Sequence, residues 1–305
     1  MPCYHPLTGY WSKSVNASGK RSVVFNPKEG YVDREVVVPC GQCIGCRLER
    51  SRQWAVRCVH ESSLYDRNCF ITLTYSDEYL PRDGSLDVAH FQKFMKRLRK
   101  RFGTNIRFFH CGEYGENFGR PHYHACLFNF DFDDKKLWKE CNGNKLYTSE
   151  ALEKLWPMGI SSIGEVNFQT AAYVARYIMK KVNGPNAEEH YLRADPDTGE
   201  IYSLKPEYTT MSRRPGIGKG WLDKFTSDVY PSDFLVMNGA KMRPPRYYDN
   251  QFELVDDKLM SRLKSKRVIE GKKFLDNNTP ERLNVREQVQ LARLNKLKRT
   301  VDKET

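Results

Sequence analysis

Two apolar runs separated by a short glycine-bearing loop constrain the fold of this chain more than any other feature. IRFFHCGEYG at residues 106–115 and PHYHACLF at residues 121–128 are rich in the aromatic residues that favour strands. We therefore expect two neighbouring strands that form an antiparallel hairpin. Side chains alternate between the two faces of a strand, so His122 and His124 share one face.

Paired imidazoles on one face of a strand are typical of a metal site. If Glu113 lies opposite His122 in the hairpin, its carboxylate joins both histidines around one ion, because cross-strand partners share a face. A register slip of one residue would bring His110 to that face and remove Glu113. Two imidazoles and one carboxylate favour Mn²⁺ by affinity, or Mg²⁺ by abundance, as a Lewis acid. The alternative is two satisfied polar histidines on a half-exposed strand.

TAAYVARYIMKKV at residues 170–182 has the pattern of a helix that carries two tyrosines on one face. Tyr173 and Tyr177 are four residues apart, and Lys180 and Lys181 extend this face by one turn. A phenol is a poor nucleophile at neutral pH and needs positive charge nearby. Beside a divalent metal, the tyrosines could attack a phosphodiester while a lysine stabilises the negative charge. The alternative is a structural role at the edge of the core.

Further elements complete a predicted α+β core. CFITLTYS at residues 69–76 indicates a buried strand, and ISSIGEV at 160–166 contains a short one. Between them, residues 84–103 have helical periodicity, with Ser85 and Asp87 as candidate caps. The order of these elements predicts a central, mainly antiparallel β-sheet with flanking helices.

A cluster of cysteines near the N-terminus has the spacing of metal ligands. Cys40, Cys43 and Cys46 form a C-x₂-C-x₂-C run, and Cys3 or His5 could supply a fourth ligand. The N-terminus lacks the apolar core of a signal peptide, so we expect the nine cysteines to be reduced thiols or metal ligands. A structural zinc ion is the favoured interpretation. An iron–sulfur cluster or reduced surface thiols are the alternatives.

The charge balance indicates a polyanionic partner. Lys and Arg total 50 against 38 Asp and Glu, which gives a net charge of +12 and a pI of about 9.2. Nucleic acid is the partner that such a balance favours. No run approaches the ~18 apolar residues of a membrane helix, so we expect no membrane association. We expect four regions: a cysteine-rich segment and helix (1–66), the core (67–185), an accessory part (186–252) and a basic tail, helical or disordered (253–305).

The motifs together resemble the HUH endonucleases, and most closely the rolling-circle replication initiators of gokushovirus-type microviruses, which are small single-stranded DNA bacteriophages. Three motifs appear in order: the strand FITLTY, the P-H-x-H of residues 121–124, and Y-x-x-x-Y followed by lysine at 173–181. Glu113 in GEYG stands nine residues before His122, where the family has its third ligand. PCGQCIGCR and SRRPGIG also look like stretches of these phage proteins.

The resemblance implies a metal-dependent endonuclease and strand transferase. It would nick one strand of origin DNA with a tyrosine, leaving a 5′-phosphotyrosine link and a free 3′-hydroxyl, and rejoin the displaced strand. The Y-x-x-x-Y pair implies that the DNA end can pass between two phenols. The expected partners are single-stranded and origin DNA and the host replication machinery, in the cytoplasm of a bacterial host cell.

A helicase is not predicted within this chain. RRPGIGKGW contains a Gly-Lys pair but lacks the upstream glycine and the Ser or Thr after Lys219 that a phosphate-binding loop needs. We therefore expect a loop here and a helicase from the host. Two rival functions remain: a non-catalytic, zinc-dependent DNA-binding regulator, and an HUH transposase or relaxase with a different target.

Overall fold

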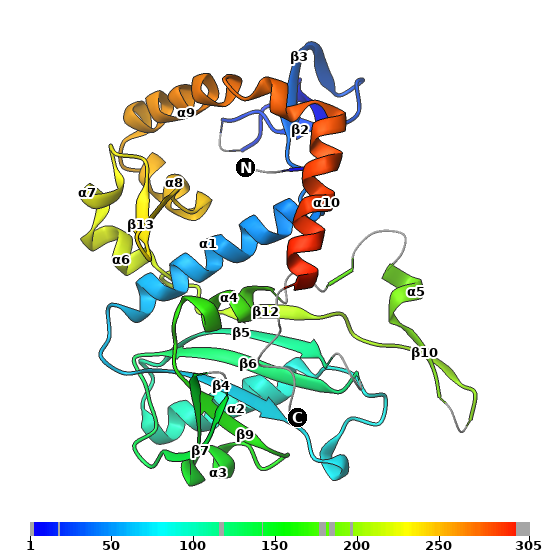
Figure 1. Cartoon of the computed structure of the whole chain (residues 1–305), viewed down its shortest axis with the longest axis vertical. Helices are drawn as coiled ribbons and strands as arrows, with labels where there is room; N and C mark the ends of the chain where they lie inside the picture. The colour runs from blue at the N-terminus through cyan, green and yellow to red at the C-terminus, as the bar shows by residue number, and fades with distance from the viewer. Residues whose placement is uncertain are drawn as a thin grey trace. The chain divides into compact units, whose positions relative to one another are not determined.

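The computed structural model describes residues 3–17, 19–115, 119–141, 143–176, 181–182, 187–195 and 198–296 (Figure 1). The described chain divides into two compact units. The first lies within Met1–Arg50 and Val268–Lys298, and the described part of the second lies within Ser51–Arg267.

The second unit is built on a seven-stranded sheet. The strands follow the order β12-β5-β6-β4-β9-β8-β7, and every neighbouring pair is antiparallel. The α+β prediction with a mainly antiparallel sheet is therefore confirmed. The strands are β4 (Asn68–Thr74), β5 (Arg107–Tyr114), β6 (Pro121–Phe128), β7 (Lys136–Cys141), β8 (Asn144–Thr148), β9 (Ser161–Gly164) and β12 (Tyr208–Met211).

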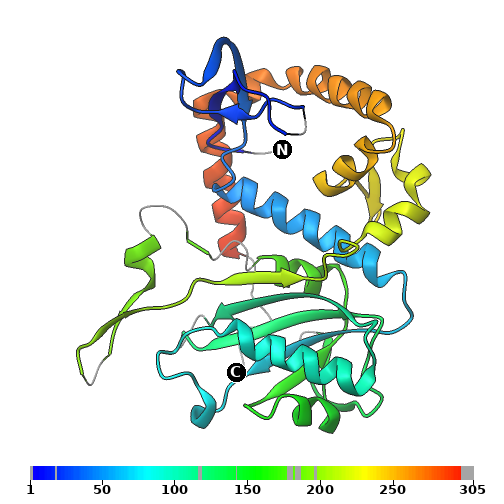
Figure 2. The same ribbon diagram turned by 180° about the vertical axis from the view of Figure 1, so that it is seen from behind.

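One face of this sheet is covered by α2 (Val88–Phe102) and α3 (Glu150–Leu155), as Figure 2 shows for α2. The buried side of α2 packs with alternate residues of the strands, including Tyr123 and Leu127, in one apolar cluster. As expected, Asp87 caps α2: its side chain accepts a hydrogen bond from the backbone N–H of Ala89. Burial of this apolar stripe is the main force that holds α2 on the sheet.

The opposite face is covered by α4 (Phe168–Arg176) and by the part of α1 (Ile44–Ser62) that lies in the second unit. Here Ala55 of α1 and Val174 of α4 are fully buried with Phe109 and Cys126 of the strands. Small alanines on both helices allow close approach to the sheet. This is the face toward which β6 directs His124.

The predicted helix over residues 170–182 is wrong at its C-terminal end. Among the described residues, α4 spans Phe168–Arg176, and Lys181 and Val182 are not helical. The backbone N–H of Val182 donates to the hydroxyl of Tyr191 (3.1 Å). Tyr177 and Lys180 lie outside the described residues.

Several elements in the second unit were not expected. Residues 136–148 form the β7–β8 hairpin at one edge of the sheet, and β12 lies at the other edge beside β5. The remaining elements are η1 (Asp77–Tyr79), α5 (Ala187–Tyr191), β10 (Leu192–Ala194), β11 (Ile201–Ser203), α6 (Lys219–Lys224), α7 (Thr226–Val229), β13 (Leu235–Met237), β14 (Ala240–Met242) and α8 (Arg246–Glu253).

The first unit combines the N-terminal segment with a C-terminal helix. β1 (Leu7–Ser12), β2 (Val23–Val24) and β3 (Gly30–Val38) form an antiparallel sheet. The segment predicted as a basic tail contains α9 (Asp257–Lys272), η3 (Leu275–Asn278) and α10 (Pro280–Lys296). Among the described residues, no helix has both the length and the apolar character needed to cross a membrane.

Candidate active site and metal centres

The hairpin brings the predicted carboxylate to the predicted histidines. Glu113 of β5 is the register partner of His122 of β6, and Cys111 is the partner of His124. The expected register is therefore confirmed. His110 lies on the other face, where its ring stacks on Phe91 with a centroid distance of 3.3 Å.

Glu113, His122 and His124 form a compact triad. One carboxylate oxygen of Glu113, Oε1, lies 2.9 Å from Nε2 of each histidine. The three candidate ligand atoms all lie within 4.8 Å of one another, so this group could bind one metal ion. The side chains of Glu113 and His124 are 1% and 3% exposed, whereas His122 is 16% exposed. Access to the triad is therefore on the His122 side.

Hydrogen bonds at the Nδ1 atoms orient both imidazoles. Nδ1 of His122 donates to the backbone carbonyl of Arg120 (3.0 Å), because a carbonyl oxygen can only accept. Nδ1 of His124 lies 2.9 Å from Oγ1 of Thr72 on β4. Such partners fix the tautomer and tilt of a metal-binding histidine and leave Nε2 as its electron-pair donor.

The electrostatics of the triad fit a cation. Burial raises the pKa of Glu113, but the hydrogen bonds from His122 and His124 outweigh burial and lower the pKa to about 2. The carboxylate is therefore ionised at neutral pH. Because Nδ1 of His122 carries a proton, its Nε2 can donate to Glu113 at 2.9 Å only from a charged ring, whereas a neutral ring presents a lone pair to the carboxylate. These lone pairs repel each other unless the ring is protonated or a cation lies between them, and two nitrogens and one oxygen suit a divalent ion.

The helix α4 places a tyrosine beside the triad. The ring of Tyr173 on α4 stands at 86° to the ring of His124, with 5.1 Å between their centroids. It also packs edge-on against Phe70 of β4 (6.3 Å) and is 7% exposed. Of the four predicted catalytic residues, Tyr173 is therefore placed beside the triad. Lys181 is described and half-buried, whereas Tyr177 and Lys180 lie outside the described residues.

Thr72 is a site residue that sequence analysis missed. It is the register partner of His124 across the β4–β6 pair, two strands away from Glu113 in the sheet. The signal was present in the alternation of FITLTY, which places Thr72 and Thr74 on one face of their strand. The sequence did not show which strand would lie beside β6, so neither threonine could be assigned to the histidines.

The loop in SRRPGIG is held by buried polar groups. The carboxylate of Glu61 accepts a hydrogen bond from the backbone N–H of Gly218 (2.7 Å) and forms an ion pair with Arg107. Nε of Arg57 donates to the carbonyl of Ile217 (2.9 Å). The N–H of Gly218 is thus already used by a protein carboxylate, which agrees with the expectation that this stretch is not a phosphate-binding loop.

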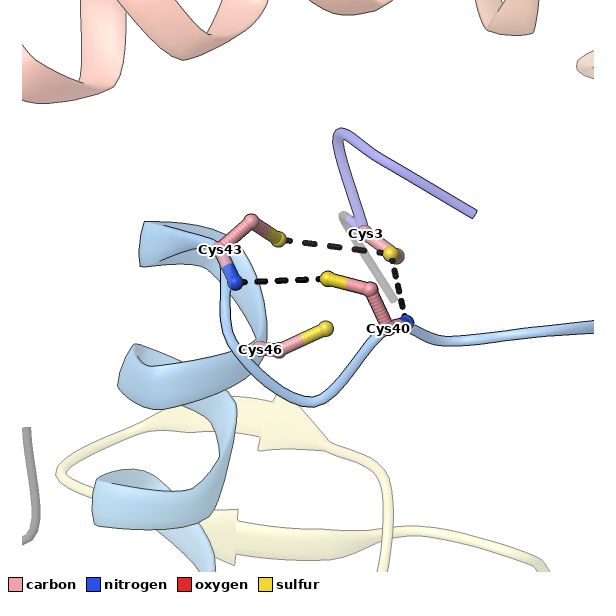
Figure 3. A group of neighbouring side chains, drawn as sticks. All are labelled: Cys3, Cys40, Cys43 and Cys46. Atoms are coloured by element: carbon pink, nitrogen blue, oxygen red, sulfur yellow. Dashed lines mark hydrogen bonds between the residues drawn. The ribbon is translucent and has the colours of Figure 1, made fainter. Parts of the chain in front are cut away.

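The four predicted cysteines form a second group. The sulfur atoms of Cys3, Cys40, Cys43 and Cys46 all lie within 4.8 Å of one another and could bind a metal ion (Figure 3). His5, the alternative fourth ligand, instead pairs with Glu287 of α10 at 2.6 Å. Burial raises the pKa of the Cys43 thiol, but hydrogen bonds from the backbone of Tyr4 and from the neighbouring cysteines lower it to about 7.

Comparison with known proteins agrees with this geometry. The family described as "Replication-associated protein ORF2/G2P" matches residues 68–182, which run from β4 through the triad and α4. Over 266 residues, the chain is 34% identical to replication-associated protein VP4 of Bdellovibrio phage phiMH2K, covering 83% of this chain and 78% of that protein. The chain belongs to this family of replication-associated proteins.

Two further replication-associated proteins are similar to this chain. Identity is 33% over 267 residues with ORF2 of Spiroplasma virus 4, covering 82% of this chain and 79% of the relative. Identity is 28% over 220 residues with ORF4 of Chlamydia phage 1, and the match covers 69% of this chain and 52% of the relative. No solved structure matches. The prediction of a relationship to microvirus replication proteins is confirmed.

Proposed function

We propose that this replication-associated protein is the origin-nicking endonuclease that starts rolling-circle replication. The observation that carries the proposal is the contact between Tyr173 and His124, because it puts a phenol beside a triad of metal-ligand type. A tyrosine in this position can become covalently joined to DNA. The membership in a family of replication-associated proteins supports the same conclusion.

The triad residues would bind the catalytic ion and keep its site rigid. Glu113, His122 and His124 would hold Mg²⁺ or Mn²⁺, which supplies Lewis-acid polarisation of the scissile phosphate when bound. The low pKa of Glu113 keeps its carboxylate charged, and Thr72 and the Arg120 carbonyl hold the imidazoles in place. Such preorganisation removes the need to reorient ligands when DNA binds.

The tyrosine performs the covalent step. Its phenolic oxygen loses its proton and attacks phosphorus, and the bond from phosphorus to the 3′ oxygen of the preceding nucleotide breaks. The downstream fragment stays joined to the tyrosine through its 5′-phosphate, and the 3′ oxygen of the upstream fragment takes up a proton to leave a free hydroxyl. Tyr177 would accept the DNA end in a second transfer, which rejoins the displaced strand. Lys180 and Lys181 would stabilise the negative charge that develops.

DNA would bind on the face of the sheet that carries Glu113, His122 and His124. The exposed basic side chains of α2, including Lys93, Lys96 and Lys100, belong to the helix that covers the other face. They therefore do not lead into the triad, and we assign them to solvation of the helix surface. A host helicase would separate the strands, and the protein would act in the cytoplasm of a bacterial cell.

The test is a search for a covalent adduct. A pool of single-stranded oligonucleotides that tile the encoding phage genome would be incubated with the protein and Mn²⁺, then separated on a denaturing gel. With 3′-end label, radioactivity should move to the protein. With 5′-end label, a shorter free fragment should appear that a polymerase can extend, because it ends in a 3′-hydroxyl.

Two variants serve as controls for this experiment. The Tyr173→Phe/Tyr177→Phe double variant should form no adduct, and His122→Ala should form none while binding DNA, because affinity comes mainly from phosphate contacts. DNA binding without cleavage by the unaltered protein would support a non-catalytic regulator instead. Cleavage of unrelated hairpins in preference to any genomic oligonucleotide would favour a transposase or relaxase.

A further inference from the structure

We propose that Cys3, Cys40, Cys43 and Cys46 bind one structural zinc ion that holds the first unit together. The four sulfur atoms lie within 4.8 Å of one another, and the sulfurs of Cys3 and Cys43 are 4.0 Å apart (Figure 3). A tetrahedral zinc ion with bonds of ~2.3 Å places its sulfur ligands ~3.8 Å apart. A disulfide would need ~2.05 Å. The spacing is therefore that of four thiolates around a single ion.

The backbone around these sulfurs is arranged to stabilise negative charge. The N–H groups of Gln42 and Cys43 point to the sulfur of Cys40 at 3.4 and 3.3 Å. The N–H of Cys40 points to the sulfur of Cys3 at 3.2 Å, and that of Tyr4 to the sulfur of Cys43 at 3.3 Å. Donors directed at sulfur favour the thiolate, which is the form that binds metal.

The compactness of the group favours an ion over a cluster. An iron–sulfur cluster places two or more irons and bridging sulfides between its ligands, so its cysteine sulfurs must spread further apart than around one ion. The four sulfurs here lie within 4.8 Å of one another, and the four side chains gather around one small space in Figure 3. Four thiolates in a closed tetrahedral set are typical of a structural zinc site without an open coordination position.

The first unit has little other core. Its buried apolar cluster consists of Tyr4, Cys43, Cys46 and Leu283, so two of the four members are proposed ligands. Several large apolar side chains of its small sheet are exposed instead, including Trp11, Val32 and Val37. A unit of this size with so little buried apolar surface needs an additional constraint to fold. Metal binding would supply folding free energy directly.

The site also reaches the C-terminal helix. Leu283 of α10 packs on Tyr4 and the cysteines, and His5, next to Tyr4, pairs with Glu287 of the same helix at 2.6 Å. The ion would thus fix three segments directly: the N-terminus, the Cys40–Cys43 loop and the first turn of α1. It would fix α10 indirectly, through the residues that follow Cys3.

Metal analysis of the unaltered protein, purified without added metal, tests the site. We expect one zinc per chain that survives dialysis and is released when the thiols are blocked with an organomercurial. The His122→Ala/His124→Ala double variant should keep this zinc, which separates the cysteine site from the triad. Iron in place of zinc, or no metal both as purified and after reconstitution under reducing conditions, would overturn the proposal.

Substitution with Co²⁺ tests the ligand set. The visible spectrum should show thiolate charge transfer and d–d bands of a tetrahedral four-sulfur site, unchanged in His5→Ala. Cys3→Ser should change the spectrum or lose the ion. A change of spectrum in His5→Ala with no change in Cys3→Ser would show that His5 is the fourth ligand.

Hydrogen exchange on the zinc-free protein tests the structural role without any variant. Removal of zinc should accelerate exchange in the N-terminal segment and in 280–296, while β4, β5 and β6 keep their protection. Equal protection of 280–296 with and without zinc would refute the role in holding α10. Adduct formation is measured separately, so failure of the nicking proposal and failure of this proposal give different results.

Discussion

Thr72→Val is the substitution that most directly tests whether the triad is a preorganised metal site. Valine has nearly the shape of threonine but cannot accept the hydrogen bond from Nδ1 of His124, which is now 2.9 Å from Oγ1. His124 is only 3% exposed, so water cannot replace the lost partner. An unsatisfied buried donor costs ~1–3 kcal/mol. We expect metal affinity to fall by about 10- to 100-fold, which is typical when a metal-binding histidine loses the hydrogen-bond partner of its other ring nitrogen.

Thr74→Val provides the matched control. Thr74 lies two residues along the same strand as the register partner of His122, and its hydroxyl donates to the backbone carbonyl of Ile160 (2.9 Å). This variant loses one exposed hydrogen bond and keeps the hydrogen bonds of both histidines intact. Water can replace the lost donor, so Thr74→Val should lower the free energy of unfolding by less than Thr72→Val does, by at most about 1 kcal/mol.

The assay is the single-turnover rate of adduct formation as a function of Mn²⁺ concentration, with Mn²⁺ binding followed independently by electron paramagnetic resonance. Thr72→Val should shift both midpoints to higher concentration, and saturating Mn²⁺ should restore most of the rate. The reasoning is refuted if Thr72→Val shifts the binding midpoint no further than Thr74→Val does. A loss of rate without any shift in binding would also contradict it, because Thr72 would then act on chemistry rather than on the ligand.

Three more expectations follow from the proposed chemistry and the packing. Tyr173→Phe and Tyr177→Phe should each retain single-turnover cleavage but lose the second transfer; repeated rounds by either variant would show that the phenols do not alternate. Deletion of residues 253–305 should destabilise the protein as well as weaken DNA binding, because it removes the fully buried Met260; an unchanged melting temperature would contradict this. Burial lowers the pKa of His60 from 6.5 to about 4, so the unfolded state binds the proton first. The free energy of unfolding should fall by up to ~3 kcal/mol as pH drops from 6.5 to about 4, and a His60→Gln variant should lack this fall in urea titrations.

The sequence alone determined the central hairpin and the triad that it carries. Two strands joined by a loop of few residues can pair only in the antiparallel direction, because parallel pairing needs a long crossover connection. Side-chain alternation then decides which residues share a face. Given this pairing, Glu113 and the two histidines meet through contacts that are local in sequence. The grouping of Cys40, Cys43 and Cys46 could be predicted for a similar reason, because their spacing is also local in sequence.

Other parts were decided only by the tertiary structure. The position of β4 beside β6 selects Thr72 as the partner of His124, and no local pattern states which strand will be the neighbour. Cys3 groups with the other three cysteines, whereas His5 pairs with Glu287 of α10, more than 270 residues along the chain. In each case, a group distant in sequence competes for a hydrogen bond or a ligand position, and local propensity carries no information about that competition.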